Sequence, residues 1–153
     1  WPPSPLRLFQ ALVAGAASRW NERTRLTYAV PALEWLAKQP APQIVAATGV
    51  PSQDKYRLYV PNNAADLVAS AWHRGTVNAS IADHRTEKDV RLVRLNGEAV
   101  HYLYPLAESD PGFAAHEQPL IAAARSVTHL GWGVDMVAGN AGVVSDEEVT
   151  KLD

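Results

Sequence analysis

The first stretch of the chain, Trp1–Ala17, constrains the fold most, because a helix start signal leads there into a continuous apolar stripe. Ser4 can cap the first turn, and Pro5 has the preset φ of a first helical residue. The spacing predicts a helix from Pro5 to about Trp20 whose small residues at 14–17 allow close approach to a sheet. The stripe that we expect to be buried comprises Leu6, Phe9, Leu12, Val13, Ala16 and Trp20.

Shorter patterns follow this helix. We predict a second helix over 32–38, opened by Pro31, and two short strands over 43–48 and 56–60, with a turn at 49–52 between them. Leu67, Ala71 and Trp72 then mark a short amphipathic segment, with a loop as the alternative.

The middle of the chain contains a strong hairpin signal. Core patterning is weak over about 62–89, which predicts an irregular excursion. Asn96–Gly97 is typical of a type I′ turn, because both positions of that turn need positive φ. We therefore expect strands over 90–95 and 98–104 to pair across it.

A helix over 117–129 and a strand over 132–137 complete the pattern. With one strand expected before Trp1, the order becomes β-α-β-β-α-β, a ferredoxin-like α+β fold. We expect this domain to span 1–138 and residues 139–153 to form an acidic tail or linker toward a further domain.

Composition supports one globular domain of 153 residues, of which 47% are hydrophobic. The absence of cysteine excludes disulfides and thiolate metal sites and favours the cytoplasm. Residues 1–107 carry 12 Lys and Arg against 8 Asp and Glu, whereas residues 108–153 carry 2 against 8. The basic part of the chain is therefore the part suited to face phosphates.

Several short motifs resemble one CRISPR-associated family. They lie at 1–5, 32–36, 59–63, 85–94 and 100–106. The chain resembles, over most of 1–135, the type I-G (formerly I-U) Cascade subunit that fuses a part binding the handle of the guide RNA (crRNA) to a repeat-processing endoribonuclease part.

The resemblance implies a RAMP-type ferredoxin-like fold in a protein that holds the five-prime handle of crRNA. It implies other Cascade subunits as partners, and target DNA through the complex, with no membrane and no cofactor. In that family the nuclease part follows C-terminal to this stretch, and no residue here matches it. We therefore predict no catalytic residue and no metal site.

A basic tract over 85–94 is the main candidate for RNA contact. Its cations would bind phosphates, and tyrosines downstream would stack on unpaired bases. A solvated strand edge and core aromatics are the alternatives for the two sets. The residues predicted to bind RNA are Arg85, Lys88, Arg91, Arg94, Tyr102, Tyr104, Arg7 and Arg19.

Two other functions stay open at this point. One is a metal-independent ribonuclease that uses His73 or His101 as acid or base, although a lone histidine more often has a structural role. The other is a protein-interaction module whose arginines bind acidic partners. A Gly-rich phosphate loop and a histidine pair at metal spacing are both absent from the sequence.

Overall fold

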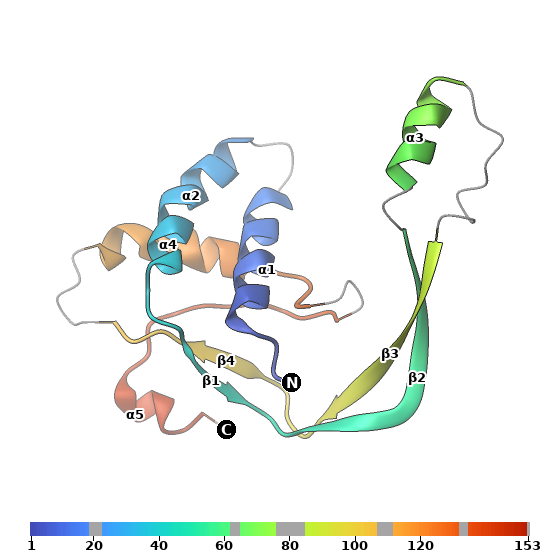
Figure 1. Ribbon diagram of the computed structural model, residues 1–153. Helices are drawn as coiled ribbons and strands as arrows, with labels where there is room; N and C mark the ends of the chain where they lie inside the picture. The colour runs from blue at the N-terminus through green and yellow to red at the C-terminus, as the bar shows by residue number, and fades with distance from the viewer. Residues whose placement is uncertain (19–22, 62–64, 76–84, 107–111, 132–134, 153) are drawn as a thin grey trace. The chain divides into compact units, whose positions relative to one another are not determined.

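The computed structural model describes residues 1–18, 23–61, 65–75, 85–106, 112–131 and 135–152 (Figure 1). These residues form an α+β structure with five helices and two antiparallel two-stranded sheets. The chain divides into two compact units, which we call the core unit (1–48 and 97–153) and the hairpin unit (49–96). The predicted α+β class is therefore confirmed.

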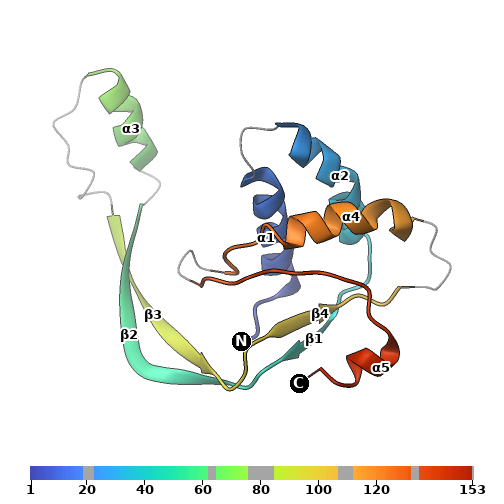
Figure 2. The same cartoon turned by 180° about the vertical axis from the view of Figure 1, so that it is seen from behind.

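Three helices make up most of the core unit: α1 (Pro5–Ser18), α2 (Arg23–Ala37) and α4 (Phe113–Ala124). They pack on one another on one side of the small β1–β4 sheet (Figures 1 and 2). Their buried side chains are aliphatic, which fits a core stabilised by hydrophobic burial. This cluster comprises Leu12, Ala16, Ala29, Leu33, Leu36, Ala123, Ala124 and Val127.

Helix α1 is a core helix, as predicted. Its first backbone hydrogen bonds end on the Ser4 carbonyl, which accepts from the amides of Arg7 at 2.9 Å and Leu8 at 3.2 Å. The predicted stripe needs two corrections, because Leu6 is 65% exposed and the close approach is to a helix. A Cβ on Gly15 would lie 3.0 Å from the carbonyl oxygen of Ala123 in α4. The remaining stripe residue, Trp20, lies outside the described residues.

Both of the later helices start before the predicted positions and contain a proline. Helix α2 starts at Arg23 and runs through Pro31, and α4 starts at Phe113 and runs through Pro119. Proline removes one backbone hydrogen bond from a helix. In α2 the buried face continues across the proline from Ala29 to Leu36, so burial outweighs that loss.

Helix α4 also ends at Ala124, before the predicted end at residue 129. The Ser126 hydroxyl donates to the Ala122 carbonyl at 2.8 Å, and such side-chain bonds compete with helix continuation. The predicted strand covers 132–137, of which residues 132–134 lie outside the described residues. The described part makes one isolated bridge, between His129 and Met136.

The predicted tail contains α5 (Asp146–Val149), which starts with a capping box.

The small sheet of the core unit pairs β1 (Gln43–Ala46) with β4 (Val100–Leu103). The N-terminal stretch is tied to this sheet by two side-chain hydrogen bonds. The Trp1 indole donates to the Ala47 carbonyl at 2.8 Å, and the Tyr102 hydroxyl donates to the Pro3 carbonyl at 2.7 Å.

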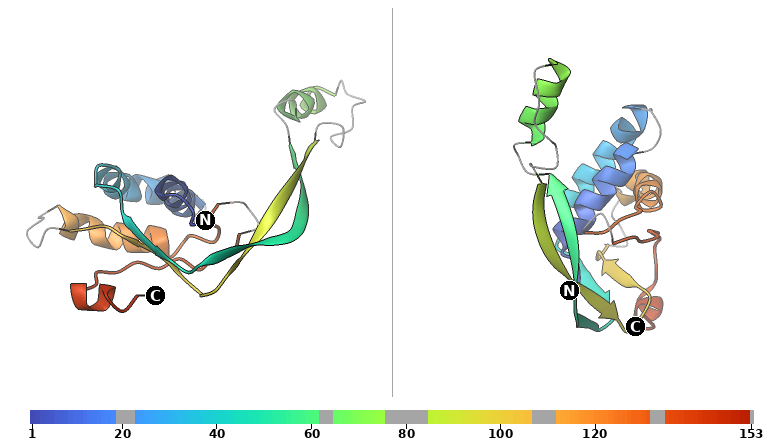
Figure 3. Two further views of the ribbon diagram at one scale, coloured as in Figure 1. Left: turned by 60° about the horizontal axis from the view of Figure 1, so that its bottom comes forward. Right: turned by 90° about the vertical axis from the view of Figure 1, so that its right-hand side faces the viewer.

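The hairpin unit pairs β2 (Gly49–Pro61) with β3 (Arg85–Leu95) and also contains α3 (Ala65–His73). The predicted turn at 49–52 is wrong, because β2 continues through it and absorbs extra residues in an irregularity between Pro51 and Lys55. The segment marked by Leu67, Ala71 and Trp72 is helical, as α3, but Trp72 is 63% exposed. Figure 3 shows β2 and β3 twisting around each other, as two-stranded ribbons do.

The hairpin predicted at Asn96–Gly97 is also wrong. Strand β3 pairs with β2, and β4 pairs with β1, so the two strands flanking this dipeptide are not partners. Gly97 is not among the described glycines with positive φ. A Cβ there would lie 2.6 Å from the Cβ of Ala47, so glycine is needed for close strand approach rather than for a turn.

Candidate nucleic-acid interface

The β2–β3 ladder distributes its side chains over two chemically different faces. Residues directly opposite each other in an antiparallel pair project to the same face, and neighbours along a strand alternate. Arg57 lies opposite Asp89, and Leu58 lies opposite Lys88, which fixes both faces.

One face, which we call the charged face, carries mainly ionic residues. It comprises Lys55, Arg57 and Tyr59 on β2 and Arg85, Glu87, Asp89 and Arg91 on β3, and the alternation continues on this side of β3 with Val93 and Leu95. The other face, which we call the apolar–basic face, mixes hydrophobic residues with two cations. It comprises Tyr56, Leu58 and Val60 on β2 and Thr86, Lys88, Val90, Leu92 and Arg94 on β3.

Cross-strand ion pairs organise the charged face. The Arg57 guanidinium lies 2.8 Å from Glu87 and 3.6 Å from Asp89, and the Lys55 ammonium lies 3.5 Å from Asp89. Glu87, then a hydrogen bond with Tyr59, then Asp89 raise the pKa of Arg57 above its usual value. All of these side chains are exposed, so solvent screens the pairs and they contribute little to stability.

Tyr59 and Arg85 form a cation–π pair at the end of the same face. The guanidinium carbon of Arg85 lies 5.4 Å from the centre of the Tyr59 ring. Together with the hydrogen bond from Arg57, this contact occupies one side of the ring and its hydroxyl. Tyr59 is therefore held in place by two arginines of the charged face.

The apolar–basic face has no carboxylate among the residues just named. Leu58, Val60 and Val90 are half-buried, whereas Tyr56 is 46% exposed and Leu92 is 47% exposed. This face therefore offers solvent-accessible aromatic and aliphatic surface beside Lys88 and Arg94.

All four cations of the predicted tract are exposed on β3, but they do not form one row. Arg85 and Arg91 lie on the charged face, and Lys88 and Arg94 lie on the apolar–basic face. A single strand of RNA that follows one face would therefore meet two of the four.

The whole chain matches a known protein family. The family described as CRISPR-associated protein, GSU0054 family, matches residues 1–153. The chain belongs to this family of CRISPR-associated proteins. The comparisons with curated proteins and with solved structures gave no match.

Three other predicted RNA-binding residues of this CRISPR-associated protein, Tyr102, Tyr104 and Arg7, lie in the core unit. Burial raises the pKa of Tyr102 and of Tyr104, and Tyr104 packs against the helical core. Tyr102 uses its hydroxyl on the Pro3 carbonyl. Arg7 is exposed on α1, and Arg19 lies outside the described residues.

The two candidate catalytic histidines belong to different units. His73 is exposed at the end of α3, and His101 lies on β4 opposite Val45. Within the described ranges, no group of three or more His, Cys, Asp or Glu residues could hold a metal ion. Across the same ranges, no helix has the length and hydropathy that a membrane span requires.

The sequence analysis did not include Lys55, Arg57 and Tyr56 among the candidate residues, although they lie on the same ladder as the basic tract. The signal was present, because Lys55, Arg57 and Tyr59 alternate with the period of a strand. Interpreting 49–52 as a turn shortened β2 and removed Lys55 from it.

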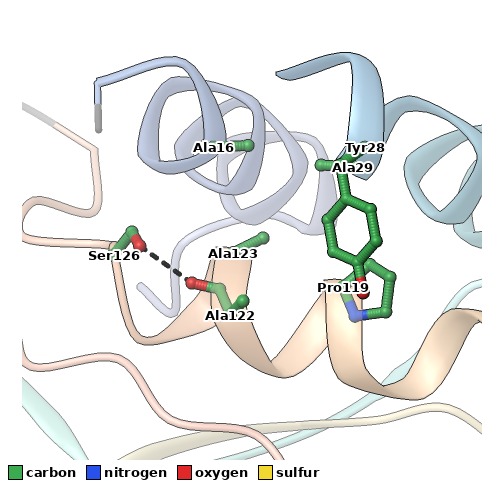
Figure 4. A pocket seen from close by; sticks show the side chains of 7 residues that line it. All are labelled: Ala16, Tyr28, Ala29, Pro119, Ala122, Ala123 and Ser126. Carbon is green, nitrogen blue, oxygen red and sulfur yellow. Dashed lines mark hydrogen bonds between the residues drawn. The ribbon is translucent and has the colours of Figure 1, made fainter. Parts of the chain in front are cut away.

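A small hollow in the core unit is a poor candidate for a site. It has a volume of about 240 Å³ and is lined by residues of α1, α2 and α4, with Tyr28 beside Pro119 (Figure 4). Its lining is mostly alanine, and the Ser126 hydroxyl is already bonded to the Ala122 carbonyl. This hollow lacks the convergent polar groups that a ligand site needs.

Proposed function

We propose that this chain holds the five-prime handle of crRNA in a type I-G Cascade complex and that it does so without cleaving RNA. The observation that supports this proposal is a β2–β3 ladder with exposed cations and exposed aromatics in a CRISPR-associated protein. Cations of this kind bind backbone phosphates irrespective of sequence, and exposed aromatic rings stack on unpaired bases.

The proposal includes an assembly role. Other Cascade subunits are the expected protein partners, and target DNA is reached through the complex. The ferredoxin-like arrangement belongs to the same proposal, with the antiparallel β1–β4 pair as its second and third strands in chain order and residues 139–153 as a linker. Further strands beside this pair would complete the sheet.

The test uses the full-length protein produced with its CRISPR array and partner subunits. We expect one defined crRNA species to co-purify, and we expect the variant Arg85→Gln/Lys88→Gln/Arg91→Gln/Arg94→Gln to lose it. A control variant, Lys38→Gln/Lys151→Gln, removes two exposed charges from the core unit and should retain the RNA. Random RNA, or none, bound to the wild type would instead support the protein-interaction alternative.

The ribonuclease alternative has its own test. Repeat RNA incubated with a fragment limited to residues 1–153 should stay intact, since no catalytic residue is assigned to it. Cleavage that disappears in His101→Ala or His73→Ala would overturn the non-catalytic assignment.

A further inference from the structure

We infer that the RNA lies along the apolar–basic face of the β2–β3 ladder rather than along the charged face. This inference rests on the proposed function and names the surface that performs it. It divides the basic tract, because it assigns Lys88 and Arg94 to the RNA and assigns Arg85 and Arg91 to the opposite face.

Charge is the first argument. On the charged face, Glu87 and Asp89 would repel phosphates, and they already pair with Lys55 and Arg57. RNA binding there would have to break these ion pairs or place phosphates beside carboxylates. The named residues of the apolar–basic face include two cations and no carboxylate, so their charge is complementary to a phosphate backbone.

The aromatic residues give a second argument. Tyr59 on the charged face has Arg85 against its ring and a hydrogen bond with Arg57. Tyr56 on the apolar–basic face is 46% exposed, somewhat less than Tyr59 at 54%, but it lies directly opposite the aliphatic Val90. A base can stack on Tyr56 with aliphatic surface around it, whereas stacking on Tyr59 competes with an existing contact.

The spacing of the two cations gives a third argument. Lys88 and Arg94 lie on the same side of one uninterrupted strand and are separated by roughly 20 Å, at about 3.3 Å per residue. Leu92 lies between them and is 47% exposed. A single-stranded RNA can therefore contact a cation at each end and apolar surface in between, and it would wind with the twist of the ribbon (Figure 3).

The experiment measures binding of the full-length protein to a labelled single-stranded RNA that carries the five-prime handle of its own repeat. Two matched double variants each remove two exposed cations from β3. We expect Lys88→Gln/Arg94→Gln to lower the slope of log affinity against log salt by about 1.4, at about 0.7 for each phosphate contact. We expect Arg85→Gln/Arg91→Gln to lower it by less than half as much.

A second pair of variants tests stacking. Tyr56→Ala should weaken binding on the order of 10- to 100-fold with the salt slope unchanged, while Tyr59→Ala should weaken it less than about threefold. Circular dichroism and thermal unfolding of each variant separate loss of binding from loss of structure.

The outcomes distinguish the two proposals. If the wild type binds no handle RNA, the proposed function fails and this inference fails with it. If the wild type binds but the larger or an equal loss follows Arg85→Gln/Arg91→Gln, the handle-binding function stands and the face assignment is overturned. If Lys88→Gln/Arg94→Gln binds RNA normally but no longer co-purifies with the other subunits, the face is a protein interface and the inference is overturned.

Discussion

The core unit and the hairpin unit are stabilised in different ways. Every buried hydrophobic side chain that the structure describes lies in the core unit, on α1, on α2 or in the segment from α4 to Val127. The hairpin unit instead exposes large apolar side chains, such as Val50 at 60% and Trp72 at 63%. It depends on backbone pairing and cross-strand contacts.

This difference separates the part of the chain that stabilises the fold from the part that offers accessible surface. Hydrophobic burial supplies most of the free energy of folding, whereas a two-stranded ribbon alone is only marginally stable. The core unit is therefore the part that resists unfolding. The hairpin unit, with its side chains in solvent, is the part that offers surface to a partner.

The largest expected effect on stability comes from creating a cavity in the core unit. Leu12→Ala or Leu36→Ala should lower the free energy of unfolding by about 2 to 5 kcal/mol, because each side chain is almost fully buried. Urea unfolding followed by circular dichroism measures the change. The control Leu92→Ala, on the hairpin unit, should change it by less than about 0.5 kcal/mol. Equal losses in the two units would contradict the comparison.

The next effect is overpacking between α1 and α4. Gly15→Val should cost about 1 to 3 kcal/mol, because a Cβ at this position already lies 3.0 Å from the Ala123 carbonyl oxygen and 3.1 Å from the Ser126 carbonyl carbon. Thermal unfolding measures the loss. Gly142→Val is the control, since a Cβ there meets nothing within 4 Å. A wild-type melting temperature for Gly15→Val would show that the helices can separate freely.

A smaller effect comes from the hydrogen bond between Tyr102 and the Pro3 carbonyl. Tyr102→Phe should cost about 0.5 to 1.5 kcal/mol at neutral pH, measured by urea unfolding. Burial raises the pKa of Tyr102, so its contribution is present below pH 10 and is lost as the pH rises through the folded-state pKa. The gap between wild type and variant should therefore shrink at alkaline pH. Tyr56→Phe in the hairpin unit is the control, and a pH-independent gap would refute the assignment.

The smallest effect concerns the ion pairs of the charged face. Raising NaCl to about 1 M should increase amide exchange in β2 and β3 relative to α1 and α2, because exposed pairs are screened and buried aliphatic contacts are not. Hydrogen exchange with mass spectrometry measures both units in one sample. Arg57→Met should remove most of the salt response of the hairpin unit. A salt response that is the same in both units would argue against this difference.

The sequence predicts the helical part of the fold better than the strand pairing. Apolar spacing locates α1 because burial depends on a local period, and Leu12 and Ala16 are buried as expected. The predicted starts of α2 and α4 are too late, because proline in a sequence typically marks the first turn of a helix. In the structure both helices continue through Pro31 and Pro119, since tertiary burial outweighs the local cost of proline. Helix propensity alone carries no information about that burial.

The strand partners depend on contacts between residues far apart in the chain. Asn96–Gly97 is a strong turn signal, yet Gly97 is required by its distant neighbour Ala47. The basic tract is evident from composition, but its division between two faces follows from the register of β3 against β2. A residue list without a partner strand therefore cannot show which two cations lie together.

The pairing of Gly49 with Leu95 has a consequence for how this chain tolerates change. The first residue of β2 lies opposite the last residue of β3, and paired backbones of this kind are only about 5 Å apart. The hairpin unit is therefore an insertion whose two ends nearly meet, and a short turn could replace it without pulling on α1, α2 or α4. Its length and tip can therefore be changed while the parent domain keeps its packing.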